Sequence, residues 1–410
     1  MASPATASAD VLHQQGLASK QALDMEAACE RFAAAAALGH AGAQVELARM
    51  QLHGIGCEVD AGAAIGWLER AEPASPIASY LLALVASGDS ALPRDARMDA
   101  RLLAAANAGL APALLASAVH FGRKPQPEAQ AACMRLLGAA AQRGHAIAAL
   151  LLERRLELGE GCERDARAAE ALRRQLAQSG IERLPDTPFD APGAQDDPAP
   201  LEPCASRIVP PAMELRATRP RIATCERLLS ADECRLLIAH ARLHLRPSRT
   251  VHPLTGAPLS MPLRTSSGAT FDPLLEDIAI RLVQARMAVA AGLPLVNAEH
   301  LTVLRYAPGE EYRPHRDALP PASIQADHPQ AGNRIRTLCA YLNPVAAGGE
   351  TEFPAPGVRI IPRAGCAVAF DNLGPDGFAD PDSLHAGLPV ERGEKWLATL
   401  WLRERRYRDF

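Results

Sequence analysis

The chain lacks several features that mark specialised classes of protein, and each absence excludes one class. Aromatic residues make up only 4% of the 410 residues, and 43 Lys and Arg face 47 Asp and Glu, which gives a net charge of -4. A dedicated nucleic-acid-binding protein is normally basic, so we expect no nucleic acid partner. No apolar run reaches the length of a membrane-spanning helix, so we expect no membrane partner.

The cysteines and the first residues bear on the cellular compartment. The nine cysteines are an odd number, and no two of them are separated by just two residues. This pattern fits reduced thiols better than a disulfide framework or a zinc module. The opening stretch, MASPATASADVLHQQ, contains neither a basic segment nor an apolar one, so no secretory signal is visible. We therefore expect a cytoplasmic protein.

Composition divides the chain into two halves. Its length indicates two or three domains of roughly 100–200 residues each. Eleven of the sixteen aromatic residues follow residue 205, whereas the first 180 residues are rich in alanine. Residues 181–205 contain six prolines, which disfavour helix and indicate an extended linker. We predict a helical-repeat solenoid at 1–180, a linker at 181–205 and a second domain at 206–410.

The first half repeats itself. The octapeptide GIGCEVDA at 54–61 returns as GEGCERDA at 159–166, an offset of 105 residues or three periods of 35. A stretch that starts with a large apolar residue and ends on alanine recurs in the same phase, at 32–36, 67–71, 102–106 and 137–141. Periods of this size indicate stacked helical hairpins. Over residues 29–178 the sequence resembles the SEL-type, tetratricopeptide-like repeat family, in about four copies. The resemblance implies a surface that binds a protein partner; the alternative is a solenoid that only packs against the second domain.

The second half alternates between helical and strand-like patterns. Ser230 to Glu233 form a capping-box signature before a helix that runs to about His244, and Pro273 is placed to start a second helix near 273–291. Strands are predicted at 300–307, 334–343, 357–361, 366–371, 384–390 and 394–404. The predicted fold class is therefore multidomain: an α-solenoid of helical hairpins, then an α+β domain built as a double-stranded β-helix, or jelly roll, with backing helices.

Three residues of the second half could form a metal site. On an extended chain, His315 and Asp317 point to the same face, and His385 is the obvious third donor. Two imidazoles and one carboxylate on one face of an octahedron leave three positions open, as in non-haem Fe(II) oxygenases. The alternatives are hydrogen-bonded structural histidines, or a zinc hydrolase that uses the same three residues.

Lys395 adds a second element to this hypothesis. It lies ten residues after His385, on a strand where it shares its face with Trp401. A lysine that points into a barrel is costly unless it is paired, and a bound dicarboxylate would supply the partner. The alternative is a surface lysine on an edge strand.

Taken together, residues 206–410 resemble the prolyl 4-hydroxylase family of Fe(II)/2-oxoglutarate dioxygenases. The matching stretches, in order, are RTSSGA at 264–269, LRYAPG at 304–309, YRPHRD at 312–317, RIRTLCAYLN at 334–343, GGETEFP at 348–354, SLHAG at 383–387 and GEKW at 393–396. The resemblance implies Fe(II), 2-oxoglutarate as co-substrate, dioxygen, and stimulation by ascorbate.

The resemblance also implies roles for individual residues. The implied iron ligands are His315, Asp317 and His385. Residues implied to bind 2-oxoglutarate are Lys395, which pairs with the distal carboxylate, and the hydroxyls of Thr351 and Tyr306. Residues implied to lie near the substrate are Arg334, Tyr312 and Trp401, with Arg264 and Ser266 bordering the substrate groove. The segment 318–333 is expected to be a mobile flap, and its His328 a solvated histidine.

The expected function is hydroxylation of prolyl residues in a protein or peptide, with the repeats as a partner-binding module. Breaking a non-acidic C–H bond is cofactor chemistry, so the protein has to bind and orient the reactants. One alternative keeps this chemistry on a free amino acid or another small molecule. Another is a repeat scaffold with an inactive oxygenase domain, although the complete set of three metal ligands and Lys395 argue against decay.

Overall fold

The computed structural model describes residues 8–185, 205–248 and 263–409. The chain divides into two compact units, one that ends at Leu114 and one that runs from Leu115 to Asp409. Within the described ranges, no single helix combines the length and the apolar character needed to cross a membrane. Most of the expected linker, residues 186–204, lies outside the described residues, so the domain boundaries remain a prediction.

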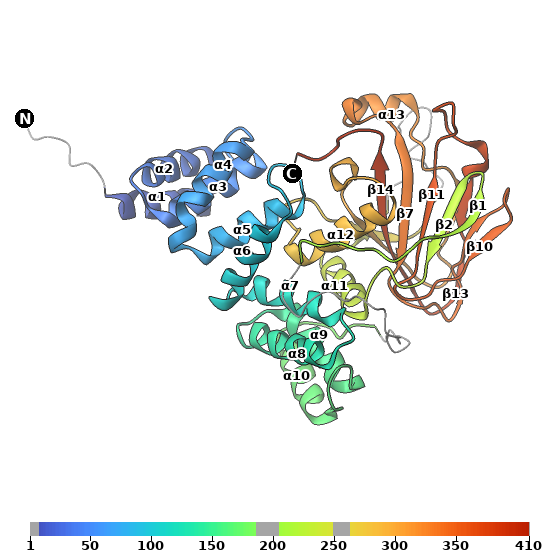
Figure 1. Ribbon diagram of the computed structural model, residues 1–410, viewed down its shortest axis with the longest axis horizontal. Helices are drawn as coiled ribbons and strands as arrows, with labels where there is room; N and C mark the ends of the chain where they lie inside the picture. Colours follow the sequence, from blue (N-terminus) through green and yellow to red (C-terminus); the bar gives the residue numbers. More distant parts are fainter. Residues whose placement is uncertain (1–7, 186–204, 249–262, 410) are drawn as a thin grey trace, which may run out of the picture. The chain divides into compact units, whose positions relative to one another are not determined.

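The first unit is built from consecutive helices that pack on one another (Figure 1). They are α1 (Ala9–Gln21), α2 (Met25–Ala37), α3 (Ala41–His53), α4 (Ala61–Ala71), α5 (Pro76–Ser87) and α6 (Ala96–Asn107). Alanines such as Ala28, Ala35 and Ala48 are fully buried, so neighbouring helices can approach closely. Phe32 and Leu68 fill the space that remains between them.

The helical repeat predicted from the sequence is confirmed. The four recurring stretches all lie in helices, namely α2, α4, α6 and, in the second unit, α8 (Pro127–Gln142). The two copies of the octapeptide begin at equivalent helix ends. Gly54 ends α3 and Gly159 ends α9 (Ala146–Leu158), both with the left-handed backbone, φ 64° and 74°, that glycine adopts without steric cost. Helix α7 (Ala111–Gly122) precedes α8, and α10 (Ala166–Gln178) follows α9.

The rest of the second unit is a two-sheet sandwich. The larger sheet has the order β1-β2-β11-β7-β14-β5-β4-β3 and the smaller one β10-β9-β12-β6. The strands of the larger sheet are β1 (Glu214–Thr218), β2 (Arg221–Cys225), β3 (Arg246–Pro247), β4 (Ser267–Thr270), β5 (Thr302–Tyr306), β7 (Arg334–Tyr341), β11 (Ala367–Asp371) and β14 (Lys395–Arg403). Those of the smaller sheet are β6 (Tyr312–His315), β9 (Thr351–Phe353), β10 (Val358–Ile360) and β12 (His385–Gly387). A two-stranded ribbon joins β8 (Ala347–Gly348) to β13 (Val390–Arg392).

The apolar core lies between the two sheets, which confirms the jelly-roll fold class. Leu304, Tyr341 and Phe370 of the larger sheet pack in one buried cluster with Phe353 of the smaller sheet. Two helices, α11 (Ala231–Arg242) and α12 (Ile278–Ala290), contact strands of the larger sheet, as expected for backing helices (Figure 1).

The capping box at α11 is confirmed, and two boundaries of the prediction are wrong. Helix α12 begins at Ile278 rather than at Pro273, because the Asp277 side chain accepts a hydrogen bond from the Ile280 backbone and caps the helix there. The strand predicted at 384–390 is two strands, β12 and β13, which pair with different partners. Several short strands, including β6, were not predicted.

The part of α7 from Leu115 onward and helices α8 to α10 belong to the same compact unit as the sheets, and buried ion pairs join this part of the repeats to α11. Arg155 on α9 donates to Asp232 on α11 at 2.6 and 2.9 Å, and both side chains are buried. Arg235 on α11 donates in turn to Glu160, at 2.8 Å for one of its two bonds. A Cβ at Gly122 would lie 2.6 Å from Asp232 Oδ2, so only glycine lets α7 come this close.

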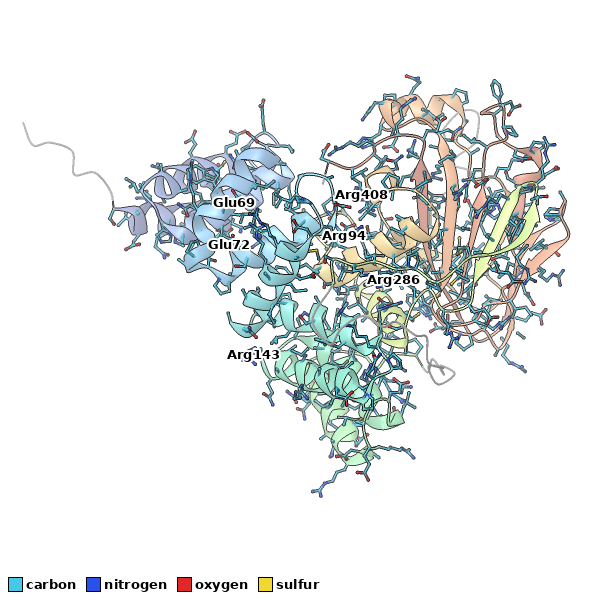
Figure 2. All side chains as sticks on the ribbon, viewed as in Figure 1. Glu69, Glu72, Arg94, Arg143, Arg286 and Arg408 are labelled. Carbon is cyan, nitrogen blue, oxygen red and sulfur yellow. The ribbon has the colours of Figure 1, made fainter. Side chains whose placement is uncertain are left out.

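A second ionic contact uses the capping box itself. The Glu233 carboxylate accepts a hydrogen bond from the Ser230 backbone at 2.9 Å, and it also pairs with Arg123, which follows α7. Arg286, which is labelled in Figure 2, lies on α12. It donates to the other carboxylate oxygen of Glu233 at 2.6 Å. Glu233 therefore caps α11 and also links this helix to Arg123 of the repeats and to Arg286 of α12.

Candidate active site

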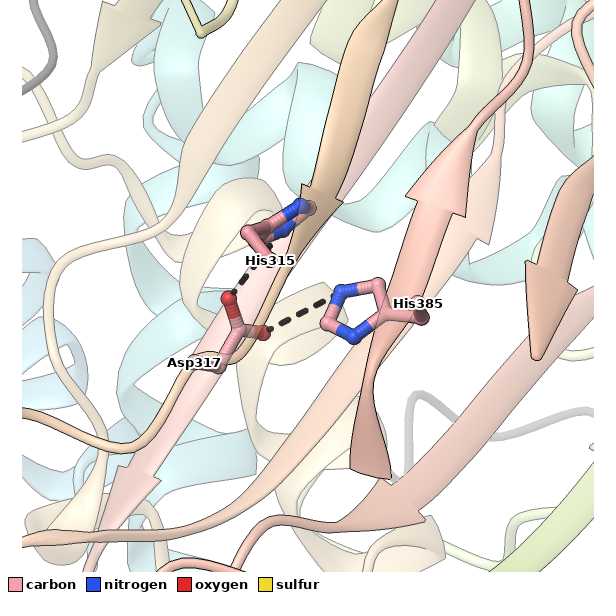
Figure 3. A group of neighbouring side chains, drawn as sticks. All are labelled: His315, Asp317 and His385. Atoms are coloured by element: carbon pink, nitrogen blue, oxygen red, sulfur yellow. Dashed lines mark ion pairs between the residues drawn. The ribbon is translucent and has the colours of Figure 1, made fainter. Parts of the chain in front are cut away.

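Three side chains with metal-binding atoms meet where two neighbouring strands lie side by side. His315 ends β6 and His385 begins β12, and the two residues are direct partners in the ladder. Asp317 follows two residues after His315 (Figure 3). Its Oδ1 lies 3.6 Å from His315 Nε2 and its Oδ2 lies 3.9 Å from His385 Nε2. One ligand atom from each residue lies within 4.8 Å of the others, so a single ion could contact all three.

A further hydrogen bond orients each of the three ligand side chains. The Nδ1 atom of His315 lies 2.8 Å from the Arg313 carbonyl, and Nδ1 of His385 lies 3.0 Å from the Ser383 carbonyl. A proton on Nδ1 satisfies each of these contacts and leaves Nε2 free to bind a metal, a common second interaction of metal-binding histidines. Asp317 is held by Thr337, whose hydroxyl donates to Oδ2 at 2.7 Å.

The protonation states suit a metal ion. Burial, and then the neighbouring His385, lower the pKa of His315 to about 3. Burial raises the pKa of Asp317, but the two histidines and Arg334 outweigh it and the pKa is lowered. At neutral pH the site therefore offers a neutral imidazole and an ionised carboxylate, the forms that metals bind.

Aromatic rings surround the ligands and restrict their motion. Tyr312 stacks on His315 with 3.4 Å between ring centroids. Phe353 stacks on His385 at 5.4 Å and Phe370 meets it edge-on at 4.6 Å. Aromatic rings therefore cover the two imidazoles, while the Nε2 atoms of both histidines face Asp317.

Lys395 lies buried at the start of β14, with only 2% of its surface exposed. Its Nζ lies 5.3 Å from the ring centre of Tyr306 and 5.6 Å from that of Tyr341. Among the described residues, no carboxylate forms an ion pair with it. Burial accordingly lowers the pKa of Lys395 from 10.5 to about 8, with Cys339 and Glu350 opposing the shift. A buried ammonium without a counter-ion favours a bound anion.

Hydroxyl groups lie around this ammonium. Tyr341 donates a hydrogen bond to Thr351 Oγ1 at 2.7 Å, and the Tyr306 hydroxyl bonds with Ser266. Thr351 and Tyr306 were expected here, but Tyr341 was not. Its alternation with Cys339 and Thr337 along β7 places all three on one face, and this was the available signal.

The residues expected near the substrate also come together. Arg334 lies over the Trp401 ring, 4.1 Å from its centre, and Arg264 lies 5.2 Å from the ring centre of Tyr312. Arg334 donates to both carboxylate oxygens of Glu299, at 2.7 Å each. Glu299 lies outside every recognised motif and was not identified from the sequence.

The segment expected to form a flap, 318–333, contains the short helix α13 (Pro321–Ala326) and is attached to neighbouring strands. The Asn333 side chain exchanges hydrogen bonds with the Leu319 backbone at 2.7 and 3.2 Å, which closes the loop. Asp327 accepts from Arg403 on β14 at 2.7 Å. His328 is 45% exposed and lies outside the ligand group, as predicted. Mobility of the segment stays a prediction.

The donor set defines what the site can hold. Three ligand atoms on one side of an ion leave room for a bidentate molecule and one further ligand. The unpaired ammonium of Lys395 suits the far carboxylate of such a molecule, and the hydroxyls of Thr351 and Tyr306 can add hydrogen bonds. A metal that is chelated by a dicarboxylate satisfies every one of these groups.

Comparisons with known proteins agree with this chemistry. Residues 301–403 match the family model of the 2OG-Fe(II) oxygenase superfamily. Over 215 residues the chain is 34% identical to probable prolyl 4-hydroxylase 10 of Arabidopsis thaliana, covering 48% of this chain and 73% of that protein. Over 206 residues it is 35% identical to prolyl 4-hydroxylase 1 of the same plant, covering 47% and 72%. A solved Sel1 repeat protein from Oxalobacter formigenes aligns with 44% of this chain and 76% of its own, at 21% identity and a TM-score of 0.40.

Proposed function

The chain belongs to the prolyl 4-hydroxylase family of 2-oxoglutarate- and Fe(II)-dependent dioxygenases, and on this premise we propose that it hydroxylates prolyl residues of a protein or peptide. The observation that carries the proposal is the presence of two features in the same two-sheet sandwich. These are the ligand group of His315, Asp317 and His385, and the buried, unpaired Lys395. A zinc hydrolase would use the first feature but has no need of the second.

Each residue has a defined task in this reaction. His315, Asp317 and His385 hold Fe(II), which together with 2-oxoglutarate and dioxygen supplies the oxidation that replaces a C–H bond with C–OH. Lys395 and Thr351 bind the far carboxylate of 2-oxoglutarate and so fix its orientation. No side chain removes a proton from carbon, because the C–H bond has no acidity for a base to use.

The substrate-side residues have binding tasks. Arg334 is held rigidly by Glu299 and by the Trp401 face, so its remaining N–H groups can donate to a peptide carbonyl. Tyr312, stacked on His315, forms an aromatic wall beside the metal on which a pyrrolidine ring can pack. Arg334 could accept either the backbone carbonyl of a prolyl residue or the carboxylate of a free amino acid as its partner, so the comparison of peptides with free proline decides between the two substrates.

The repeats of the first unit are proposed to bind a protein partner. Leu23, between α1 and α2, is 79% exposed and has a φ of 61°, a left-handed backbone that is unfavourable for leucine. Leu38, after α2, is 60% exposed. A strained and exposed leucine indicates a function other than folding. Leu23→Asn should keep or improve stability, because asparagine tolerates this backbone, but it should raise KM for a protein substrate and leave KM for a short peptide unchanged.

The first experiment measures succinate formed by the full chain with Fe(II), 2-oxoglutarate, oxygen and ascorbate. Asp317→Ala and Lys395→Ala serve as variants, and proline-containing peptides and free proline are compared as substrates. Peptide-stimulated succinate that requires both side chains, with a one-oxygen mass gain on proline, supports the proposal. Stimulation by free proline alone would replace it with the small-molecule alternative. Absence of succinate with every substrate would favour the scaffold alternative. The cytoplasmic location stays a prediction that cell fractionation tests.

A further inference from the structure

A buried polar pair behind the ligand group has no part in the reaction as described so far. Thr337 lies at the middle of β7, paired with Phe370 of β11 on one side and Trp401 of β14 on the other. It is fully buried. A buried hydroxyl is costly without a hydrogen-bond partner. Its position in the centre of the sheet therefore needs an explanation, since valine would pack there equally well.

The Thr337 hydroxyl links two other buried groups. It donates to Asp317 Oδ2 at 2.7 Å, and its oxygen accepts a hydrogen bond from Asn372 Nδ2 at 2.9 Å. Asn372, directly after β11, is also fully buried. The backbone of Asn372 makes two hydrogen bonds. Its N–H donates to the Ile335 carbonyl at 2.9 Å, and its carbonyl accepts from the Asp380 N–H at 3.0 Å.

The direction of this chain of hydrogen bonds follows from the chemistry of its members. A hydroxyl has one proton, so Thr337 can donate to either Asp317 or Asn372 but not to both. Because the Asn372 amide presents its N–H₂ group, the hydroxyl accepts there and its proton is left for Asp317. Asn372 Oδ1 has no hydrogen-bond partner among the described residues. The side-chain amide of Asn372 thus has this orientation even though its Oδ1 lacks a hydrogen bond, and a buried oxygen without a hydrogen bond costs free energy.

We propose that Asn372 and Thr337 form a hydrogen-bond relay that positions Asp317 to bind the iron through one oxygen only. This inference rests on the proposed function. The relay occupies one lone pair of Oδ2, so Oδ1, which lies 3.6 Å from His315 Nε2, is the oxygen that keeps both lone pairs for the iron. A carboxylate that bound through both oxygens would fill a fourth coordination position. Two positions would then remain, where a bidentate co-substrate and dioxygen need three.

The relay also connects the two halves of the site. Asn372 begins the segment that ends at His385, and within it the Ser383 hydroxyl donates to the Asp380 carbonyl at 2.7 Å. The Ser383 carbonyl then contacts His385 Nδ1. Asn372 therefore fixes Asp317 through Thr337 and lies at the base of the loop that presents His385. Asn372 and Thr337 are positioning residues, because neither is a metal ligand.

The test is a titration of the metal-free protein with Mn²⁺, in which free Mn²⁺ is followed by electron paramagnetic resonance. Thr337→Val keeps the shape but removes the hydroxyl, and we expect it to weaken Mn²⁺ binding roughly 10–100-fold, the usual effect of losing such a support. Thr337→Ser keeps the hydroxyl and should restore most of the affinity. Asn372→Ala should fall between the two, because the hydroxyl remains but loses the donor that orients it.

A matched control separates this effect from a general loss of packing. Thr302 on β5 is a buried threonine whose hydroxyl bonds with Thr270 at 3.0 Å, away from the ligand group. Thr302→Val should bind Mn²⁺ like the unmodified protein. Thermal unfolding of each metal-free variant, without Mn²⁺, reports any loss of stability separately.

The outcomes distinguish the relay from the proposed function. If the unmodified protein binds Mn²⁺, and Thr337→Val binds it equally tightly while folded, the relay is refuted and the metal site stands. If Thr337→Val does not fold, the comparison of Asn372→Ala with Thr302→Val decides, and equal affinities refute the relay. If the unmodified protein does not bind Mn²⁺, the proposed function fails and the relay with it.

Discussion

Replacing Lys395 by methionine should make the ligand-free protein more stable and should remove most of the stabilisation that 2-oxoglutarate provides. The pKa of Lys395 falls from 10.5 to about 8 through burial, and each pKa unit corresponds to about 1.4 kcal/mol. Keeping this ammonium charged in the folded protein at pH 7 therefore costs about 3 kcal/mol. Methionine fills a similar volume without a charge. Lys395→Met should recover much of that free energy of unfolding, as measured by denaturant titration at pH 7.

The same reasoning fixes the pH dependence and the response to ligand. Between about pH 8 and 10.5 the unfolded chain keeps the lysine proton that the folded chain gives up, so stability relative to Lys395→Met should rise across this range. 2-Oxoglutarate with Mn²⁺ and without oxygen, at 100 times its Kd, should stabilise the unmodified protein by about 2.7 kcal/mol. It should stabilise Lys395→Met far less.

Lys124→Met is the matched control, because Lys124 is an equally buried lysine of the same unit, near Phe121 and outside the ligand group. It should not gain stability, since Lys124 has partners, and it should keep the full response to 2-oxoglutarate. The reasoning is refuted if Lys395→Met is less stable than the unmodified ligand-free protein, or if 2-oxoglutarate stabilises the two equally.

Three further predictions concern charges elsewhere in the second unit. Asp232→Ala should lower the free energy of unfolding by about 3–5 kcal/mol in denaturant titration, because it leaves the buried Arg155 unpaired; a loss below 1 kcal/mol would contradict this. Burial, and then neighbouring cations, lower the pKa of His120 to about 3, so the unfolded chain binds a proton that the folded chain does not between about pH 6.5 and 3. His120→Leu should therefore lose less stability than the unmodified protein on acidification, and parallel curves would refute the assignment. Glu299→Gln should raise KM for a prolyl peptide roughly tenfold, at about 1.4 kcal/mol per factor of ten, because the amide cannot hold both N–H groups of Arg334; an unchanged KM would show that Arg334 needs no support.

The sequence was sufficient for features that local chemistry determines. The capping box of Ser230 and Glu233 specifies a helix start by itself, and the helix begins there. The spacing of His315 and Asp317 places both on one face of an extended chain, so two of three ligands could be found without the fold. The third ligand, His385, was only a candidate from the sequence, because the ladder that pairs it with His315 is visible only in three dimensions.

Features that depend on contacts between distant residues could not be predicted. Glu299 and Arg334 are 35 residues apart and meet only when the sheet forms. Thr337 looks like an ordinary strand residue, since threonine favours strands whatever its hydroxyl contacts. Pro273 was a reasonable helix start, but the Asp277 side chain provides a better cap, and competition between neighbouring starts is hard to rank from sequence.

The ionic contacts to α11 change how the helical repeat relates to the catalytic domain. If α7 to α10 served only to bind a partner, we would expect few buried charged residues where they contact α11. Instead Asp232 and Arg235 of α11 are buried there, and removing the repeats would take away their partners Arg155 and Glu160. Helix α11 packs in turn on β5, the strand that carries Tyr306 beside Lys395. The repeat helices after Leu114 therefore belong to the same compact unit as the oxygenase sheets, and the partner-binding role that we propose for the repeats concerns the helices before Leu114.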